Sequence, residues 1–379
     1  MKTRVFQALF RWTVPLLCAI IPFYACYEGI DAFGKVASKQ NSSAVIMFTG
    51  DLMCLGGQQR VAKTKNTYDF SDSFSYVNQL FQCADLTIGN LETLISPSNQ
   101  YTIKLKSIQN NPNCNAMPSY LEALYHTGFD VLVTANNHSL DGGLTGISET
   151  LEYLEAYGFH SVGTNTETNK KNFIICRVND IAIAILSYTE LINRRESLPK
   201  AECEAYVNCY SKEKIIADVK EAKEAGAEFI IAYNHWGKEN THEITMQQKE
   251  HAVEMAEAGV DLILGSHSHC LQPAEIIETT DDRRVLCMYS MGNFVSSMTK
   301  EINNDTIVLE IVLHKSDNGV FLGATGYYPM KVISYLESKR FVVVPVSKQL
   351  NGGRDTKELR KSRERIKKIL GNQIQELIP

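Results

Sequence analysis

Five clusters of polar residues, each at the end of an apolar segment, carry the side chains of this sequence that could do chemistry. Their carboxylates, carboxamides and imidazoles are the donors that borderline to hard divalent metal ions take in proteins. The clusters are, in chain order, Asp51; Asn90 with Glu92; Asn136, Asn137 and His138; His235 with Trp236; and His267 with His269. This set predicts a site for one divalent metal ion, or for two neighbouring ions.

The histidine pair is the strongest of these signals. His267 and His269 are two residues apart, so an extended backbone points both imidazoles to the same side. Asp51 and Glu92 would supply the negative charge that offsets the cations. Without ions the two carboxylates would raise each other's pKa, so their shared location would be costly.

Each cluster taken alone has a plainer interpretation. Asp51 after Gly50 could be a helix cap, Asn136 and Asn137 could form a turn, and a single histidine is more often a hydrogen-bonded core residue than a ligand. Five such coincidences at five successive strand ends are implausible, which favours the metal site. The remaining histidines lack this placement and are predicted to be surface or structural residues: His126, His160, His242, His251 and His314.

The segments between the clusters alternate short apolar runs with helical periodicity, which predicts an α/β domain with a largely parallel central sheet. Ligands bind at the carboxyl ends of the strands of such a sheet, so the clusters should converge. Glycines at three of these ends, Gly50, Gly89 and Gly265, would let the backbone turn tightly beside a ligand. We expect strands at residues 44–49, 86–89, 131–134, 182–187, 229–233, 260–264 and 285–289, and helices at 117–127, 148–157, 212–225 and 245–258.

The pattern changes after Asn293. Three β-runs without intervening helices, at residues 306–314, 324–333 and 340–345, predict antiparallel strands that close the sheet or form a second layer. Residues 357–377 predict a charged helix on the surface.

The composition narrows the class of protein. Of 379 residues, 44% are hydrophobic and 21% are charged, which excludes a disordered chain, a collagen-like fibre and a multi-span membrane protein. The 38 basic and 43 acidic residues give a net charge of −5. The chain therefore has no basic excess for neutralising phosphates, and we expect no nucleic-acid partner.

The first residues predict export. Lys2, Arg4 and Arg11 precede a short apolar stretch, residues 13–25, and this order is typical of a secretory signal, while the stretch is short for a membrane span. A cleaved signal, an uncleaved anchor and a lipid on Cys18 or Cys26 all remain open. The protein is therefore expected at the cell surface or outside the cell, with membrane anchoring undecided.

Beyond Cys18 and Cys26 the chain has eight cysteines, in a compartment that can oxidise them. Only Cys203 and Cys209 are close in sequence, and they are the one disulfide that the spacing suggests. No Cys-x-x-Cys motif occurs, which argues against a thiolate zinc site.

At the polar clusters the sequence resembles a known family. The motifs occur in one order: Gly50-Asp51-Leu52-Met53, Asn90-Leu91-Glu92, Ala135-Asn136-Asn137-His138, His235-Trp236-Gly237, Gly265-Ser266-His267-Ser268-His269 and Tyr289-Ser290-Met291-Gly292-Asn293-Phe294. They are similar to those of the bacterial capsule-synthesis family, the poly-γ-glutamate or CapA type, a branch of the calcineurin-like metallophosphoesterases. The resemblance extends over residues 44–294.

The resemblance implies a metallo-dependent phosphatase-like, four-layer αββα sandwich and one or two divalent ions, of manganese, zinc or iron. Asp51 and His269 would hold one ion, Asn137, His235 and His267 the other, and Glu92 would bridge them. His138 would be the catalytic acid, with metal-bound water as the nucleophile. Four further residues would contact the ligands or the substrate: Asn90, Asn136, Trp236 and Asn293.

Two positions depart from the wider superfamily. Met53 stands where the Asp-x-His motif has its histidine, and Glu92 stands where an aspartate is usual. The first ion would therefore lack an imidazole unless another residue substitutes for it.

The implied organisation is a signal peptide or N-terminal membrane anchor at residues 1–32, a linker at 33–43, a CapA-type metallophosphatase-like domain at 44–350 and a C-terminal charged helix at 351–379. The implied function is a metal-dependent hydrolase or transferase of capsule polymer synthesis, acting on phosphoester or γ-amide bonds. One alternative is a non-catalytic, polymer-binding subunit of a membrane capsule-synthase or export complex. A plain secreted metallophosphatase is the other.

Overall fold

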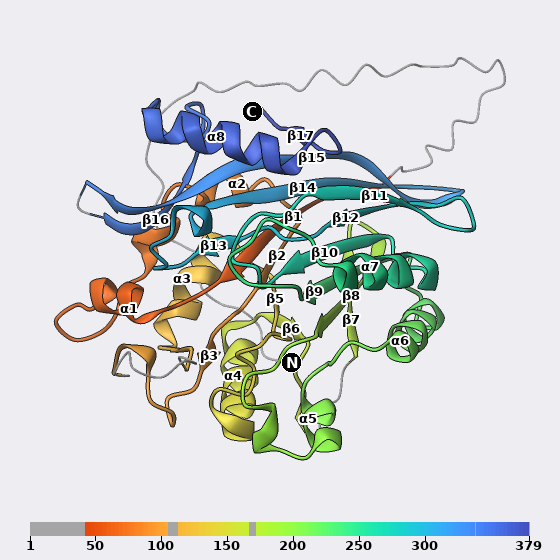
Figure 1. The fold of residues 1–379 in the computed structure, drawn as a ribbon, viewed down its shortest axis with the longest axis horizontal. Coiled ribbons are helices and arrows are strands. Elements are labelled where there is room, and N and C mark those ends of the chain that lie inside the picture. The colour runs from red at the N-terminus through yellow and green to blue at the C-terminus, as the bar shows by residue number, and fades with distance from the viewer. Residues whose placement is uncertain (1–41, 105–112, 167–171, 338, 379) are drawn as a thin grey trace, which may run out of the picture. The chain divides into compact units, whose positions relative to one another are not determined.

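The computed structural model describes residues 42–104, 113–166, 172–337 and 339–378 (Figure 1). The predicted targeting segment, residues 1–32, and the linker up to residue 41 lie outside these described residues. Within the described ranges, no helix is both long and apolar enough to cross a membrane.

Two β-sheets form the centre of the fold. In the first, β1 (Ser43–Leu52), β2 (Leu86–Asn90), β5 (Val131–Val133) and β6 (His160–Val162) are parallel, and β13 (Asn293–Val295) pairs in parallel with β1. On the other side of β1 the sheet continues with antiparallel β14 (Asp305–Ser316), β15 (Gly319–Leu336) and β16 (Lys339–Pro345). The β-runs predicted after Asn293 are therefore confirmed, and they extend this sheet. Short β17 (Gln375–Glu376) pairs with β15.

The second sheet has the strand order β11-β12-β10-β9-β8-β7. Its parallel strands are β8 (Ile181–Thr189), β9 (Phe229–His235), β10 (Leu262–Ser266) and β12 (Arg284–Met288). Antiparallel β7 (Phe173–Val178) and β11 (Ala274–Glu278) form its edges. A separate pair, β3 (Leu94–Ile95) and β4 (Asn115–Ala116), lies outside both sheets.

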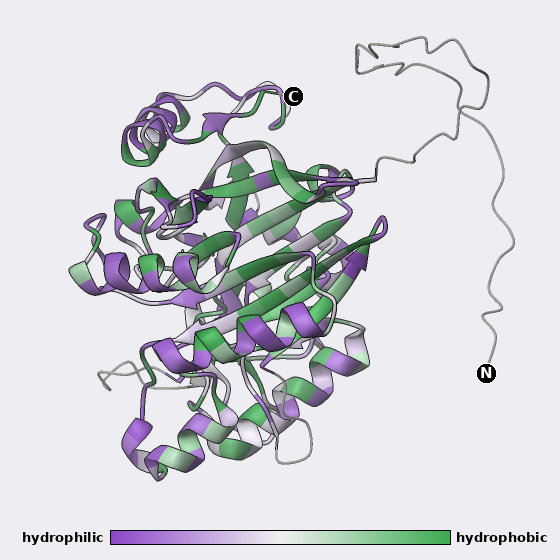
Figure 2. Cartoon of the chain, turned by 90° about the vertical axis from the view of Figure 1, so that its right-hand side faces the viewer, coloured by the Kyte–Doolittle hydropathy of each residue, from purple (hydrophilic) through white to green (hydrophobic). Residues whose placement is uncertain are grey.

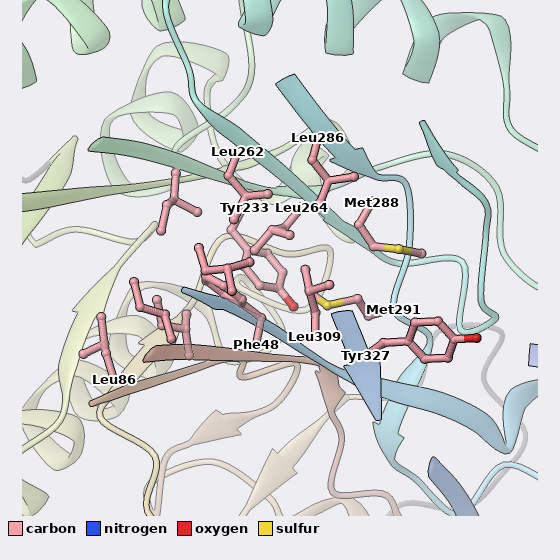
Figure 3. Packing of buried hydrophobic residues seen from close by; sticks show 14 of the residues in the cluster. Phe48, Leu86, Tyr233, Leu262, Leu264, Leu286, Met288, Met291, Leu309 and Tyr327 are labelled. Carbon is pink, nitrogen blue, oxygen red and sulfur yellow. The ribbon is translucent and has the colours of Figure 1, made fainter. Parts of the chain in front are cut away.

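The two sheets face each other across a continuous hydrophobic core. In β1, Ile46 and Phe48 point between the sheets, and Met47 points to the opposite, helix-covered face. Both faces of the strand are buried, which is why its sequence is an almost unbroken apolar run. Tyr233 and Leu264 of the second sheet enter the same core (Figure 3).

Helices cover the outer face of each sheet. Those on the first sheet are α1 (Gly56–Ala62), α2 (Asn78–Phe81), α3 (Ser119–Thr127) and α4 (Gly143–Tyr157), and those on the second are α6 (Lys212–Glu224) and α7 (Met246–Ala258). Their apolar sides pack on the sheets and their hydrophilic sides face outward (Figure 2). The layers are helix, sheet, sheet and helix, so the predicted αββα sandwich is confirmed.

The remaining elements are short. Helix α5 (Lys200–Tyr206) packs beside α4, and the 3-10 turns are η1 (Ser71–Phe74), η2 (Thr102–Lys104), η3 (Arg195–Ser197) and η4 (Glu301–Asn303). The suggested disulfide is absent: Cys203 and Cys209 are thiols in contact through a hydrogen bond, and no other cysteine of the described residues forms a disulfide.

The last helix, α8 (Lys357–Leu370), ends before its predicted limit at residue 377. Gly371, at φ 72°, stops the helix, and the chain then adds β17 to the first sheet. Leu359, Ile366 and Leu370 of α8 are buried on the side of β14 and β15 and are continuous with the core between the sheets. The helix is charged on its outer side, as predicted, but its inner side is part of the core.

Candidate metal centre

The predicted clusters come together where the parallel strands of both sheets have their carboxyl ends. Asp51 is the penultimate residue of β1, and His235 is the last residue of β9. The other clusters lie at or directly after the ends of β2, β5 and β10. None of the six predicted ligands has more than 5% of its surface exposed: Asp51, Glu92, Asn137, His235, His267 and His269.

Glu92 lies at the centre of this group. Its Oε1 is 3.8 Å from His235 Nε2, 3.9 Å from His138 Nε2 and 3.9 Å from His269 Nε2. Neither carboxylate oxygen has a hydrogen-bond partner, although both are buried. Buried carboxylates are normally hydrogen-bonded, and these separations are a little under twice a metal–ligand bond of about 2.1 Å. The residues therefore fit ions held between Glu92 and the surrounding imidazoles.

Asp51 and His269 lie on one side of Glu92. Asp51 Oδ2 is 3.7 Å from His269 Nδ1, and the three side chains offer ligand atoms that all lie within 4.8 Å of one another. Burial raises the pKa of Asp51 and raises that of Glu92 well above its usual range, and the charge of Asp51 raises the pKa of Glu92 further. Two such carboxylates are costly together unless a cation neutralises them.

Asn137, His235 and His267 form a second group. His235 Nε2 is 2.9 Å from Asn137 Oδ1 and 3.0 Å from His267 Nδ1. Burial lowers the pKa of His235 well below its usual range and that of His267 to about 3, and neighbouring histidines lower both further. Both imidazoles are thus neutral at physiological pH, which is the form that binds a metal ion. These are the three residues that the resemblance assigns to the second ion.

His138 lies against both groups without joining either. Its Nδ1 donates to Asp141 Oδ2 at 2.6 Å, and its Nε2 faces Glu92. Burial lowers the pKa of His138, but the charges of Cys114 and Asp141 and their hydrogen bonds outweigh burial and raise it well above the usual value. The Nδ1 atom is engaged by Asp141, so Nε2 is the nitrogen that can take up a proton and give it up within the site.

Three predicted supporting residues hold the ligands in place. Asn90 Nδ2 donates to Asp51 Oδ1 at 2.7 Å, and Asn293 Oδ1 accepts from His269 Nδ1 at 2.9 Å, which leaves His269 Nε2 for an ion. Asn136 Oδ1 accepts from the backbone N–H of His138 at 3.1 Å. These contacts fix the Asp51 carboxylate, the His269 ring and the backbone of His138.

Trp236 and Met53 are placed elsewhere. Trp236 is fully buried in the core outside the second sheet, where its indole N–H donates to the Tyr289 carbonyl at 2.9 Å. Its contacts are therefore those of a core residue. Met53 is buried next to Asp51 and brings no nitrogen to the centre, so the imidazole missing from the first motif is missing from the structure as well.

The backbone around the ligands is tightly constrained. A Cβ on Gly50 would lie 1.8 Å from the Gly292 carbonyl oxygen, and one on Gly265 would lie 1.9 Å from the Tyr289 carbonyl oxygen. These contacts arise because the chain crosses from β12 in the second sheet to β13 in the first directly beside the site. His267 and His269 have φ of 88° and 55°, in the left-handed region that few non-glycine residues adopt.

Sequence reasoning missed Asp141 and Cys114. Asp141 lies three residues after His138, and that spacing is a signal that could have been noticed. Cys114 lies 24 residues before His138 and has no local signal, yet its Sγ is 3.6 Å from His138 Nε2. Cys114, His138 and Asp141 form a second group of possible metal-binding side chains, beside the Asp51, Glu92 and His269 group.

Comparison with known proteins agrees with the residue pattern. The family described as "Bacterial capsule synthesis protein PGA_cap" matches residues 45–298. The PGA biosynthesis protein CapA of Bacillus subtilis is 28% identical over 312 residues, which cover 80% of this chain and 76% of that protein. The capsule biosynthesis protein CapA of Bacillus anthracis is 26% identical over 310 residues, covering 81% and 72%.

Among solved structures, the calcineurin-like phosphoesterase YfkN of Bacillus subtilis aligns with 86% of this chain and 98% of its own, at 12% identity and a TM-score of 0.48.

Proposed function

The chain belongs to the bacterial capsule synthesis protein family, and from that membership we propose that it acts outside the cytoplasm in the synthesis of an anionic capsule polymer, as a metal-dependent hydrolase or transferase. The relative in Bacillus subtilis is named for PGA biosynthesis, which supports a γ-linked glutamate polymer as the partner. The bond acted on would be a γ-amide or a phosphoester.

One observation carries the catalytic proposal: the buried carboxylate of Glu92, without a hydrogen bond, lies less than 4 Å from three imidazole nitrogens. Asp51 and His269 would hold one ion, and Asn137, His235 and His267 the other, with Glu92 between them. Bound ions would supply Lewis acidity and lower the pKa of a water molecule.

His138 supports catalysis over binding alone. Its Nε2 faces Glu92 and is the nitrogen that can exchange a proton, and Asp141 fixes the orientation of the ring through Nδ1. A leaving oxygen or nitrogen at the ions would lie within reach of that proton. A site that only binds carboxylates does not need an acid in this position.

Export is proposed from the N-terminal sequence alone. The basic residues Lys2, Arg4 and Arg11, together with the apolar stretch at residues 13–25, are typical of a targeting segment. A membrane synthase or export complex is the partner that such a location would offer.

Helix α8 favours the alternative, a polymer-binding subunit without catalysis. It carries seven Lys or Arg and two Glu in 14 residues, in a chain whose net charge is −5. Lys357, Lys361 and Lys368 lie on the side of the helix opposite its buried face, and all three are exposed. An anionic polymer could bind this side without any reaction at the metal centre.

The test is to purify the full chain, count its metal after loading with zinc, manganese or iron, and assay a phosphodiester, a phosphomonoester and γ-linked glutamate oligomers. We expect His267→Ala to lose bound metal, and His138→Ala to keep the metal while losing turnover. His126→Ala, at an exposed histidine of α3, is the matched control and should change neither.

Metal without turnover on any of these substrates would favour the polymer-binding alternative. A protein that takes up no stoichiometric metal under any loading would overturn the metal-centre assignment.

A further inference from the structure

Cys114, His138 and Asp141 form a connected line of side chains beside the metal centre. Cys114 Sγ lies 3.6 Å from His138 Nε2, and His138 Nδ1 lies 2.6 Å from Asp141 Oδ2. The same Asp141 oxygen accepts the backbone N–H of Cys114, also at 2.6 Å. All three residues are buried. A thiol, an imidazole and a carboxylate therefore follow one another at hydrogen-bond distances.

The hydrogen bonds among these three side chains argue against a metal ion held by all three. Asp141 Oδ2 already accepts two short hydrogen bonds, and one of them comes from the imidazole nitrogen that an ion held by this carboxylate would need. The hydrogen bond places a proton on Nδ1, so Nε2 is the nitrogen that can take the proton of the thiol. A nucleophile, a base and a group that orients the base are the three parts of nucleophilic catalysis.

The backbone holds Cys114 in this position. Its N–H donates to Asp141, and its carbonyl accepts the N–H of Leu94 at 2.9 Å at the start of the β3–β4 pair. Arg194 connects the segment that contains Cys114 with the one that contains Asp141. Its guanidinium donates to the Asp141 carbonyl at 3.2 Å and to Asn113 Oδ1.

We propose that Cys114 is a nucleophile for acyl transfer, with His138 as its base and Asp141 as the residue that positions His138. The proposed substrate class is the γ-glutamyl amide, which rests on the proposed function in capsule polymer synthesis. The ions would lie on the Glu92 side of His138, where that ring is 3.9 Å from the Glu92 carboxylate.

The reaction has two steps. The Cys114 thiol gives its proton to His138 Nε2, and the sulfur attacks the amide carbonyl carbon. The carbon–sulfur bond forms, the carbon–nitrogen bond breaks, and the proton passes from His138 to the leaving amine. Water, or the amino end of another chain, then attacks the thioester, the carbon–sulfur bond breaks, and the proton of the attacking group returns through His138 to the sulfur.

Arg194 favours a substrate that carries a carboxylate. Its guanidinium is half-buried beside Asn113 and the Asp141 carbonyl, and no carboxylate within the described ranges forms an ion pair with it. In a γ-glutamyl amide the γ-carbonyl reacts and the α-carboxylate stays free. A guanidinium beside Cys114 would suit that free carboxylate.

The decisive experiment is to trap the acyl-enzyme. Full-length, metal-loaded protein would be mixed with L-γ-glutamyl-p-nitroanilide, quenched in acid within one turnover and mapped by peptide mass spectrometry. We expect a mass increase of one glutamyl group on the peptide that contains Cys114. We also expect Cys114→Ala and Cys114→Ser to lose γ-amide turnover by roughly hundredfold or more while keeping their metal. Cys54→Ala, at a neighbouring buried thiol, is the control and should keep both.

Three results would overturn the proposal: undiminished γ-amide turnover in a folded Cys114 variant, loss of metal in that variant, which would make the thiol a ligand, or no γ-amide turnover by the wild-type protein. Phosphodiester turnover with bound metal in the wild type would in each case leave the proposed function standing. Because the trapping uses the wild-type protein, it decides the matter even where a variant fails to fold.

Discussion

Glu92 concentrates the electrostatic cost of the site in one residue. Its carboxylate is fully buried beside Asp51 and has no hydrogen-bond partner, and burial and Asp51 hold its pKa well above the usual range. A buried ionised group without a partner costs free energy, and an opposite charge recovers that free energy. In the metal-free protein this residue is therefore expected to destabilise the fold that it serves.

Glu92→Gln should stabilise the metal-free protein. The folded state holds the Glu92 proton more tightly than the unfolded state, so wild-type stability should fall as the pH rises from about 4.3 toward the raised pKa of the folded state. Glutamine does not ionise and should lose this dependence. At about pH 8 we expect the variant to unfold with a free energy roughly 1–3 kcal/mol higher than wild type, as measured by urea denaturation.

The matched control is Glu250→Gln, at an exposed glutamate of α7, which should leave the free energy of unfolding unchanged. Adding metal should stabilise the wild type and the control but not Glu92→Gln. Equal metal-free stability of Glu92→Gln and wild type at both about pH 5 and about pH 8 would contradict this account.

At the residue scale, the sequence identified the candidate ligands wherever a metal-binding side chain stands at the end of an apolar strand. Asp51, Glu92 and His267 could be selected because each is a donor that follows an apolar strand. Cys114 could not, because its contact with His138 depends on how a distant loop returns to the site. Trp236 was selected for its neighbours in a motif, and its large apolar ring instead packs in the core.

At the scale of elements, α8 joins a hydrophobic face to a basic one. Arg363 pairs with Glu376 at 2.8 Å, and Arg365 pairs with Asp305 at 2.7 Å. Within the described ranges, Lys357, Lys361 and Lys368 have no acidic partner, and they span about 16 Å along one side of the helix. Their charge is therefore available to an anionic partner.

Reversing these charges should weaken polymer binding. Replacing Lys357, Lys361 and Lys368 together by glutamate should lower the affinity for γ-linked polyglutamate roughly tenfold at low salt, with a smaller difference at high salt. Fluorescence anisotropy with a labelled polymer would measure this. A control with Lys65, Lys220 and Lys249 changed to glutamate carries the same total charge. An equal loss in both triple variants would show that net charge, and not α8, governs binding.

Local signals explain which element limits could be predicted. Helix α7 begins at a capping box of Thr245 and Gln248 and ends at Gly259, with φ 107°, as the sequence indicated. Helix α4 begins at Gly143, five residues before its predicted start, and its first turn packs so closely on Leu94 that a Cβ on Gly146 would lie 2.9 Å from that side chain; the sequence does not reveal this contact. The short β6 and β13 were missed, since three residues form no periodic pattern.

At the scale of the whole molecule, the C-terminal segment shares the core that supports the site. Leu359, Ile366 and Leu370 lie beyond the family match, which ends at residue 298, and belong to the same buried cluster as residues of β1 and β14. Arg365 also neutralises the buried Asp305. The predicted division at residue 350 stays a prediction, and the packing indicates that the two parts fold together.

Removing residues 351–379 should therefore destabilise the protein strongly. The deletion exposes the partners of three buried aliphatic side chains, each worth about 2–5 kcal/mol when truncated, and leaves Asp305 with Lys331 alone at 3.4 Å. We expect insoluble protein, or a melting temperature far below that of the full chain. Calorimetry on both forms would measure it, and equal melting temperatures would refute the shared core.

The overall architecture was predictable for two reasons. The strand and helix patterns are long, and strands that alternate with helices can pack in only a few layered architectures. The division of the strands between two sheets was implied by the resemblance and not by the periodicity, since apolar strands of either sheet look alike in sequence. The crossing from β12 to β13 was likewise invisible, because nothing local marks a chain that changes sheets.

The crossing from β12 to β13 limits which residues of the site can be substituted. At Gly50 and Gly265 even one additional carbon atom would collide with a carbonyl of the crossing segment. The side chains of the candidate site can be replaced without moving their neighbours, because only the atoms beyond Cβ change. The two glycines have no such freedom. A substitution there would have to move one sheet against the other, so the side chains of the candidate site can change far more easily than the backbone that carries them.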